Sequence, residues 1–220
     1  MNDALGTSFV TESQDEGRGR AGRHWYSPAG AGIYCTTVLP QELNNRVLPA
    51  VGFWASRAVV CAVDSALGVE LDLKWPNDLV LRGRKCCGIL TEGRSSGTGN
   101  RVAVGVGLNV NRPELAPPEG AFEAGWLSDA LGRSIDRTQL LARILAEYEG
   151  SFDALVADPA LIIRDWAERA RIKGRRLSVK SADGTVLQEG VARGLEADGA
   201  LILETKDGLR TVRLGEVDAL

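Results

Sequence analysis

The chain has 220 residues, 44% of them hydrophobic and 25% charged, and its formal net charge is −3. This composition excludes a mainly disordered chain, and the length suits one full core plus a small second module. A protein that mainly binds nucleic acid would be strongly basic, so any anion site here must be local.

The cysteines and the apolar stretches indicate a protein of the cytoplasm. The 4 cysteines lack the paired spacing of a zinc site, and we expect reduced thiols. Residues 1–7 lack the basic and apolar pattern of a secretory signal. The longest apolar stretch, residues 47–63, is short for a membrane span and contains Arg57, so we expect a buried helix and no membrane contact.

The first part of the chain is predicted to form a sheet with helices on one side. β-branched and aromatic residues indicate strands at residues 6–13 and 32–39. Residues 47–67 predict a helix that ends at Gly68, where a left-handed residue is favoured. Turn residues separate four further predicted strands, at residues 69–75, 79–81, 86–92 and 102–110.

Two helices and a small β domain are predicted to follow. Asp136 opens a helix as part of a capping box, and Asp158-Pro159 begins a second helix that reaches Arg169. The chain then changes to short strands separated by Asp-Gly pairs, which are typical of β-hairpins. These pairs are Asp183-Gly184, Asp198-Gly199 and Asp207-Gly208. They predict a small β-barrel, with a domain boundary near residue 173.

The first segment that can carry chemistry is Gly17–Trp25, which alternates glycine with arginine. Glycine lets the backbone approach a ligand closely, and arginine offers forked donors to anionic oxygens. The segment therefore suits a phosphate or a carboxylate. A solvated basic loop, or an arm that binds single-stranded nucleic acid, fits the same residues equally well.

The second segment, Lys74–Asp78, places a cation and a carboxylate around a turn. Asp78 can hold Mg²⁺ while Lys74 meets a phosphate, because magnesium sites usually combine one or two carboxylates with substrate phosphates. An ordinary Asn-Asp turn with a surface lysine is the alternative. Lys85 follows a tight turn and either adds a third positive charge or remains solvated at a hairpin end.

The third segment, residues 104–111, alternates glycine with apolar residues along a predicted strand. Glycine inside a strand usually marks the close approach of a ligand or of another backbone. Asn109 and Asn111 would share one face, and the glycine spacing is not that of a dinucleotide fingerprint. His24 is the only histidine, and its arginine-rich surroundings oppose a role as a catalytic base.

The order of these segments resembles the bacterial biotin–protein ligases. The matching segments are GRGRAGRHW at 17–25, KWPND at 74–78, KCCGILTE at 85–92 and GVGLNVN at 105–111. The resemblance extends from about Gly6 to the end of the chain. It implies an α+β fold, with a mixed β-sheet and packed helices in a class II synthetase-like catalytic domain at 1–172. An SH3-like β-barrel is implied at 173–220.

The resemblance implies an enzyme that activates biotin with ATP and Mg²⁺ to biotinyl-5'-AMP. The biotin would then pass to a lysine of a biotin carboxyl carrier domain of the acetyl-CoA carboxylase type. A homodimer is compatible with this family. A lipoate or octanoate ligase-like enzyme and a non-catalytic biotin-binding protein are the alternatives.

The resemblance also implies roles for individual residues. Those implied to be catalytic are Lys85, Arg20 and Lys74. Those implied to contact biotin or its adenylate are Gln14, Gly17, Arg18, Gly19, Arg20, Arg23, Trp25, Lys85 and Gly88. Those implied to bind ATP are Asn77, Asn109 and Trp126, and Asp78 is implied to hold Mg²⁺.

Two departures from the family concern the start of the chain. Family members that act as repressors carry an N-terminal winged helix, which is not expected here, so we expect a stand-alone ligase that does not bind DNA. The family's catalytic core begins with a strand, a Ser-Thr-Asn turn and a helix, none of which precedes Gly6. We therefore expect a catalytic domain that is truncated at its N-terminus, or a degenerate member with an incomplete biotin pocket.

Overall fold

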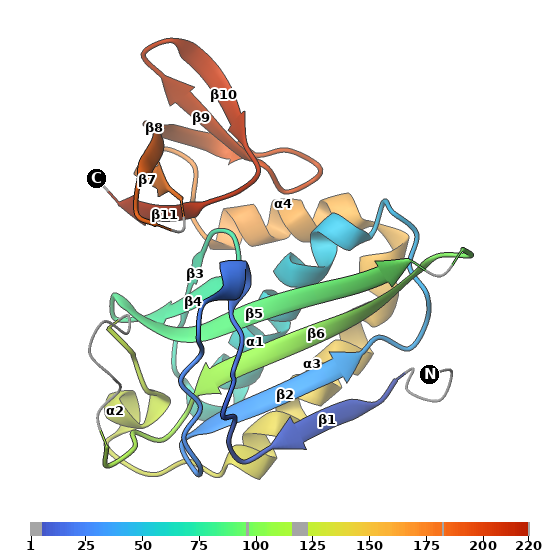
Figure 1. The fold of residues 1–220 in the computed structure, drawn as a ribbon, viewed down its shortest axis with the longest axis vertical. Coiled ribbons are helices and arrows are strands. Elements are labelled where there is room, and N and C mark those ends of the chain that lie inside the picture. Colours follow the sequence, from blue (N-terminus) through green and yellow to red (C-terminus); the bar gives the residue numbers. More distant parts are fainter. Residues whose placement is uncertain (1–5, 96, 116–122, 182, 220) are drawn as a thin grey trace.

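The computed structural model describes residues 6–95, 97–115, 123–181 and 183–219. Figure 1 shows a large sheet with helices behind it and a smaller sheet beside it. The strands of the large sheet are β1 (Ser8–Thr11), β2 (Gly32–Val38), β3 (Asp72–Lys74), β4 (Asp78–Leu81), β5 (Arg84–Ser95) and β6 (Asn100–Asn109). The helices are η2 (Arg20–Gly22), η3 (Leu48–Ala50), α1 (Val51–Leu67), α2 (Leu127–Leu131), α3 (Arg137–Ala157) and α4 (Pro159–Arg169). The smaller sheet contains β7 (Arg176–Lys180), β8 (Val186–Leu195), β9 (Leu201–Thr205), β10 (Gly208–Val212) and β11 (Glu216–Ala219).

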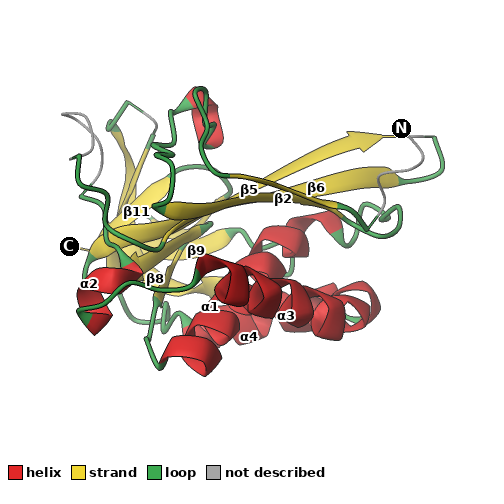
Figure 2. Ribbon diagram, turned by 90° about the horizontal axis from the view of Figure 1, so that it is seen from below, coloured by secondary structure: helices red, strands yellow, loops and turns green. Residues whose placement is uncertain are grey.

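The large sheet has the strand order β1-β2-β6-β5-β4-β3. The predicted α+β class is confirmed, and α1, α3 and α4 lie on one face of the sheet, as Figure 2 shows. Each pairing of these strands is antiparallel, so the sheet is not the mixed one that was expected. The physical reason is that short turns join β3 to β4, β4 to β5 and β5 to β6, and such turns produce antiparallel neighbours.

The helix predicted for residues 47–67 is confirmed and forms the centre of the core. It begins with η3, continues as α1 and ends at Gly68, whose φ of +64° is left-handed. By length and composition Leu48–Leu67 is able to cross a membrane, but 61% of its most apolar window is buried inside the protein, as in a core helix. Trp54 of α1 stacks on Tyr148 of α3 with ring centroids 4.6 Å apart, which fixes the two helices together.

The second sheet has the order β10-β9-β8-β7-β11, and its hairpins are those that the Asp-Gly pairs predict. The glycines of these turns have positive φ, namely 86° at Gly184, 78° at Gly199 and 99° at Gly208. In the described part of the chain β10 and β11 are edge strands that do not pair, so strand pairing leaves the expected barrel open. Residues 213–215 instead carry the chain from one edge of the sheet to the other.

The two sheets share one hydrophobic core. Leu177, Val179 and Leu203 of the small sheet belong to the same buried cluster as Trp166 of α4. The turn between β8 and β9 sits on the first domain so closely that a Cβ atom on Gly199 would lie 2.3 Å from the Phe53 ring. The small sheet is therefore held in place by buried contacts with α1 and α4.

The N-terminal cap of α3 provides a test of the fold. The Asp136 carboxylate accepts hydrogen bonds from the backbone N–H groups of Thr138 and Gln139, at 2.9 and 3.1 Å. We expect Asp136→Ala to lower the free energy of unfolding by about 1 kcal/mol, because these N–H groups lose their partner. Urea unfolding measures this, with Asp153→Ala on the exposed face of the same helix as the control. Equal losses in both variants would contradict the assignment of the cap.

Candidate functional site

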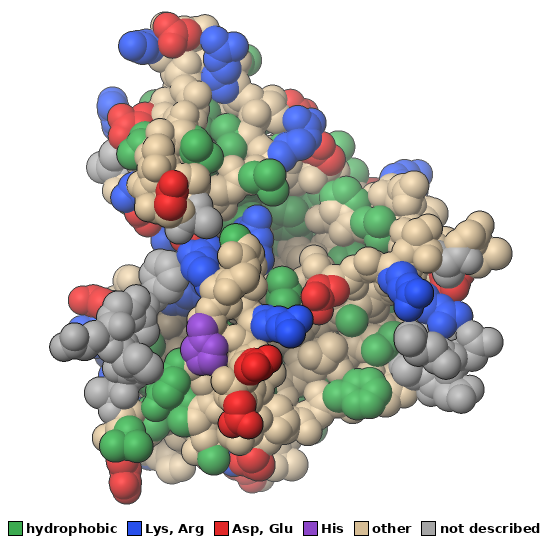
Figure 3. All heavy atoms as spheres, viewed as in Figure 1, with side chains coloured by type: hydrophobic (Ala, Val, Ile, Leu, Met, Phe, Trp, Pro, Cys, Tyr) green, Lys and Arg blue, Asp and Glu red, His purple; other side chains and the backbone are tan. Residues whose placement is uncertain are grey.

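A cavity of about 730 Å³ lies on the face of the large sheet that the helices leave uncovered. Its walls come from the glycine-arginine loop at residues 14–27, from β1, β2, β4, β5 and β6, and from Trp126 at the start of α2. Glu216 of β11 closes one end. Figure 3 shows Lys and Arg side chains gathered where the loop meets the small sheet. The cavity thus combines parts of both domains.

The glycine-arginine loop folds back on itself above the sheet. Backbone hydrogen bonds join the Trp25 N–H to Gly17 O and the Gly19 N–H to Arg23 O, both at 2.7 Å. A Cβ atom on Gly17 would lie 2.4 Å from the Trp25 carbonyl oxygen, so only glycine allows this approach. The loop is therefore a narrow hairpin that presents its arginine side chains along its edges.

The indole ring of Trp25 covers the bare glycine positions of β5 and β6. A Cβ atom on Gly107 would lie 2.4 Å from Trp25 Nε1, and one on Gly88 would lie 3.3 Å from the same ring. The alternating glycines of β6 mark a close approach, as predicted, and the approaching group is the Trp25 ring. Trp25 Nε1 is buried and has no hydrogen-bond partner within the described ranges.

Lys85 and Asp78 form an ion pair in the wall of the cavity. The distance from Lys85 Nζ to Asp78 Oδ1 is 2.7 Å, and Asp78 is only 9% exposed. Strand pairing in the β4–β5 hairpin explains the contact. Asp78 lies opposite Gly88, and a register shift between Leu79 and Val80 places Lys85 opposite Val80. The same ammonium lies 5.6 Å from the centroid of the Trp25 ring, within range of a cation–π contact.

Arg20 connects the loop to the turn after Trp75. Its Nη1 donates to Asn77 Oδ1 at 2.9 Å, and Asn77 Nδ2 donates to the Ile89 carbonyl at 2.7 Å. Burial lowers the pKa of the Arg20 guanidinium, and the nearby carboxylates of Asp78 and Glu216 oppose this shift. The loop is thereby closed onto the β4–β5 hairpin by one partly buried cation.

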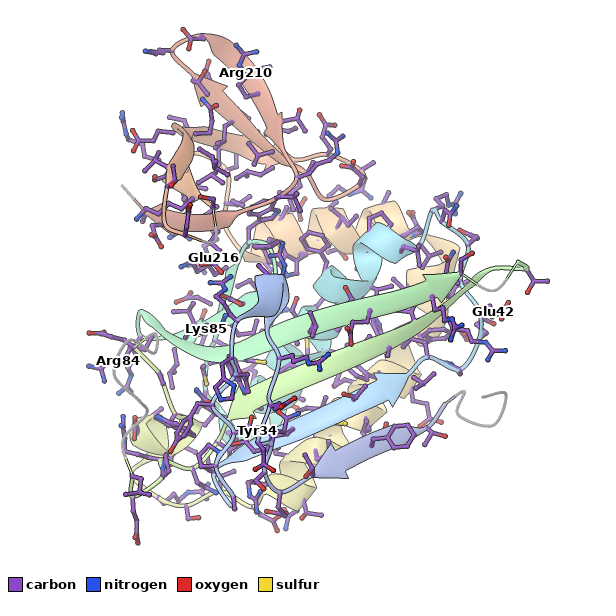
Figure 4. The ribbon with its side chains drawn as sticks, in the orientation of Figure 1. Tyr34, Glu42, Arg84, Lys85, Arg210 and Glu216 are labelled. Carbon is purple, nitrogen blue, oxygen red and sulfur yellow. The ribbon has the colours of Figure 1, made fainter. Side chains whose placement is uncertain are left out.

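Glu216 is a site residue that sequence reasoning missed. It lies 193 positions from Arg23, whose Nη2 donates to its carboxylate in a hydrogen-bonded ion pair. This hydrogen bond from Arg23, more than the charges of Lys85 and Lys74, lowers the pKa of Glu216. Figure 4 shows Glu216 and Lys85 near one another at the loop. No local pattern in the sequence distinguishes Glu216 from other strand carboxylates.

Most of the predicted site residues meet in this one cavity. Those that line it are Gln14, Arg18, Gly19, Arg20, Arg23, Trp25, Asn77, Asp78, Lys85, Gly88, Asn109 and Trp126. Gly17 and Lys74 are outside its lining. Gly17 supports the loop from behind, against Trp25 and Ser27. Lys74 Nζ lies 3.1 Å from the carboxylate of Asp218 in β11, so its charge faces the small sheet.

The lining of the cavity combines apolar and cationic groups. The Trp25 ring, Ala103 and the glycines of β5 and β6 supply the apolar part. The cations are those of Arg20, Arg23 and Lys85, and Lys85 lies beside the Trp25 ring. No group of three or more His, Cys, Asp or Glu side chains that could hold a metal occurs among the described residues. The arrangement suits a ligand with an apolar part and an anionic part.

Displacement of the Trp25 ring provides a test of the loop. We expect Gly107→Ala to push the ring off the sheet, because the new Cβ would lie 2.4 Å from Nε1. Trypsin should then cut faster after Arg18, Arg20 and Arg23, as measured by mass spectrometry of timed digests. Gly93→Ala on β5 is the control, since its Cβ would meet only Arg101 O at 3.9 Å. Unchanged cleavage in Gly107→Ala would contradict the described position of the ring.

The Arg23–Glu216 pair predicts a pH dependence of stability. Because the folded protein lowers the pKa of Glu216, the pair stabilises fully above the carboxyl's ordinary value of 4.5, and this contribution is lost as the pH falls through the lowered value. The difference in unfolding free energy between the parent and Glu216→Gln should therefore be largest near neutral pH and shrink in acid. Glu189→Gln, at an exposed strand position, should show no such trend.

Comparisons with known proteins agree with this arrangement. Residues 4–109 match the model of the biotin/lipoate A/B protein ligase family, and residues 174–219 match the biotin protein ligase C terminal domain. The biotin--[acetyl-CoA-carboxylase] ligase of Paracoccus denitrificans is 34% identical over 96% of this chain and 90% of that protein. The bifunctional ligase/repressor BirA of Bacillus subtilis is 33% identical over 99% of this chain and 67% of that protein.

Solved structures show the same fold. The biotin protein ligase from Aquifex aeolicus in complex with biotin and ATP superposes with a TM-score of 0.80 and 26% identity, covering 100% of this chain and 91% of that chain. The matches include both the large sheet and the small C-terminal sheet. On the identity and coverage of these relatives, the chain belongs to the biotin–protein ligase family of enzymes.

Proposed function

We propose that this protein activates biotin with ATP and transfers it to a lysine of a biotin carboxyl carrier domain. The observation that carries the proposal is that one cavity brings the Trp25 ring, with the glycines that it covers, close to Arg20, Lys85 and Asp78. Biotin has a ring with a polar urea group and an apolar chain that ends in a carboxylate, and the cavity offers polar loop side chains, apolar surface and cations to these three parts. Biotin protein ligase from Aquifex aeolicus has been solved with biotin and ATP bound.

The residues of the cavity divide between the two substrates. The ring and chain of biotin would lie against Gly88 and Gly107 once the Trp25 ring, which now covers both glycines, has moved aside, with Gln14 and Arg18 on the loop. The nucleotide would lie at the other end, near Asn77, Asn109 and Trp126. The carboxylate and the α-phosphate would then meet beside Lys85 and Arg20, since these cations lie between the two groups of residues.

The first step joins two anions, which requires positive charge between them. A carboxylate oxygen of biotin attacks the α-phosphorus of ATP, the bond to the bridging oxygen of pyrophosphate breaks, and a mixed anhydride forms. Lys85 and Arg20 would stabilise the charge that builds on the phosphorus oxygens. Closure of the loop by the Arg20–Asn77 hydrogen bond would keep water from the anhydride.

Asp78 is the proposed ligand of Mg²⁺. Magnesium usually keeps several waters and takes one or two carboxylates together with substrate phosphates, so a single buried carboxylate near the phosphate end is compatible with it. The Asp78 carboxylate now pairs with Lys85; with ATP present, Lys85 would contact the phosphates directly and Asp78 would hold the ion that faces them. The ion would supply positive charge to offset that of the triphosphate.

In the second step the amine of the carrier lysine attacks the acyl carbon, an amide forms, a proton leaves and AMP departs. No covalent intermediate with this enzyme is needed. The thiols near the cavity also make poor nucleophiles, because burial raises the pKa of Cys86 to about 12 and that of Cys87 well above its ordinary value. A carrier of the acetyl-CoA carboxylase type is proposed because the Paracoccus denitrificans relative is named for it.

ATP–pyrophosphate exchange tests the activity directly. Labelled pyrophosphate should enter ATP only when biotin is present, and omission of Mg²⁺ should abolish the exchange. Lipoate and octanoate serve as competing substrates, and exchange with either of them but not with biotin would replace the proposed substrate. Biotin binding without exchange would indicate a binding protein. Mass spectrometry of a purified carrier domain after incubation then tests the transfer.

The role of Lys85 predicts a large kinetic effect with a small structural one. We expect Lys85→Gln to lower the rate of biotin-dependent exchange by about 100-fold or more, because a charge close to the reacting phosphorus is lost. The melting temperature should change little, since glutamine keeps a polar side chain of similar shape beside Asp78. Arg193→Gln, which removes an ion-paired cation from β8, is the control. Parallel losses of rate and of melting temperature would make Lys85 a structural residue.

A further inference from the structure

The small sheet contacts Lys74 and Trp75, which come shortly before the site residues Asn77 and Asp78. Trp75 is 2% exposed, and its Nε1 donates to the Gly199 carbonyl at 3.0 Å across the boundary between the two sheets. Lys74 Nζ lies 3.1 Å from Asp218 of β11. Figure 1 shows β11 next to β3 and β4, the hairpin that carries these residues. Two adjacent residues are thus tied to two different parts of the small sheet.

The turn that accepts the Trp75 hydrogen bond is itself rigid. Asp198 accepts from the Ala200 N–H at 3.1 Å and from Arg213 Nε at 3.1 Å, which holds the turn on both sides. A Cβ atom on Gly199 would lie 2.3 Å from the ring of Phe53, so the turn rests directly on α1. The Gly199 carbonyl is therefore a fixed acceptor, positioned by the core of the first domain.

The sheet alone supports this segment weakly. β3 is the edge strand of the large sheet, contains only Asp72–Lys74 and pairs with β4 on one side. Asn77 and Asp78 follow two and three residues after Trp75, and they contact Arg20 and Lys85 in the cavity. A rotation of Trp75 would move both groups, because few residues separate them from it.

We infer that Trp75 is a positioning residue for the reaction, held by the Gly199 turn of the small sheet. Its hydrogen bond fixes the start of the turn, and the turn sets Asn77 and Asp78 at the nucleotide end of the cavity. The loop residues Gln14 and Arg18 and Gly107 of β6 belong to elements other than this turn, so we expect Trp75 to affect the biotin end of the cavity less than it affects Asn77 and Asp78. Small displacements at a reacting centre reduce rates strongly, so this bond affects catalysis more than stability.

Trp75→Phe removes the donor and keeps an aromatic ring. Trp54→Phe is the matched control, because Trp54 is 1% exposed and its Nε1 donates to Ser151 Oγ at 2.7 Å on the other side of the core. The two variants should lose similar amounts of melting temperature. Only Trp75→Phe should lower kcat for biotin-dependent pyrophosphate exchange by about tenfold and raise KM for ATP, with KM for biotin nearly unchanged.

A second measurement reports the position of Asn77 without any activity. The Ile89 N–H donates to the Asn77 carbonyl at 3.0 Å, so its hydrogen exchange follows the placement of the turn. Exchange at Ile89, measured by nuclear magnetic resonance, should be faster in Trp75→Phe than in Trp54→Phe. Equal exchange at Ile89, or equal kinetic losses in the two variants, would overturn the inference.

The kinetic test rests on the proposed function, but the exchange test does not. If the parent enzyme shows no biotin-dependent exchange, the proposed function fails and the Ile89 amide still decides the role of Trp75. If Trp75→Phe does not fold, Asp198→Ala replaces it, since the exposed Asp198 carboxylate holds the turn that contains Gly199. It should speed exchange at Ile89. Asp183→Ala, whose carboxylate accepts hydrogen bonds within the turn between β7 and β8, should leave that rate unchanged, and equal rates in the two would refute the inference.

Discussion

The ion pair between Lys85 and Asp78 is the interaction on which the site depends. A cation that faces two anionic substrates must already be present when the cavity is empty, and a largely buried charge is costly unless it is paired. The β4–β5 hairpin solves this problem by placing a carboxylate 2.7 Å from the ammonium. Arg23 follows the same rule, because it pairs with Glu216, while Arg20 donates to the neutral amide of Asn77 and lies near the carboxylates of Asp78 and Glu216.

The two sheets contribute different groups to these pairings. The large sheet supplies the bare glycine surface and the hairpin, and the loop closes above them. The small sheet supplies the carboxylates of β11, which meet one cation from the loop and one from the end of β3. Among the described residues of the small sheet, Glu216 is the one that lines the cavity. This sheet thus sets the charge balance where Glu216 meets the loop.

Local patterns predicted much of the fold and the membership of the cavity. The apolar period of residues 47–67, the cap at Asp136 and the Asp-Gly turns are each encoded by neighbouring residues, and each is present in the structure. The order of the motifs, through its resemblance to the biotin–protein ligases, implied which residues would lie together in the cavity. Glu216, the direction of Lys74 and the Trp75–Gly199 bond could not be predicted, because they depend on how two separately encoded sheets pack together.

The position of Glu216 in β11 has a consequence for the order in which the molecule is made. The loop arginine that it binds is synthesised 193 residues earlier, so a nascent chain carries the glycine-arginine loop without its carboxylate partner for most of translation. During that time the β6–β5–β4 hairpins can form, but the cavity remains open at one end. The cavity therefore gains the carboxylate partner of Arg23 only after β11 has been synthesised.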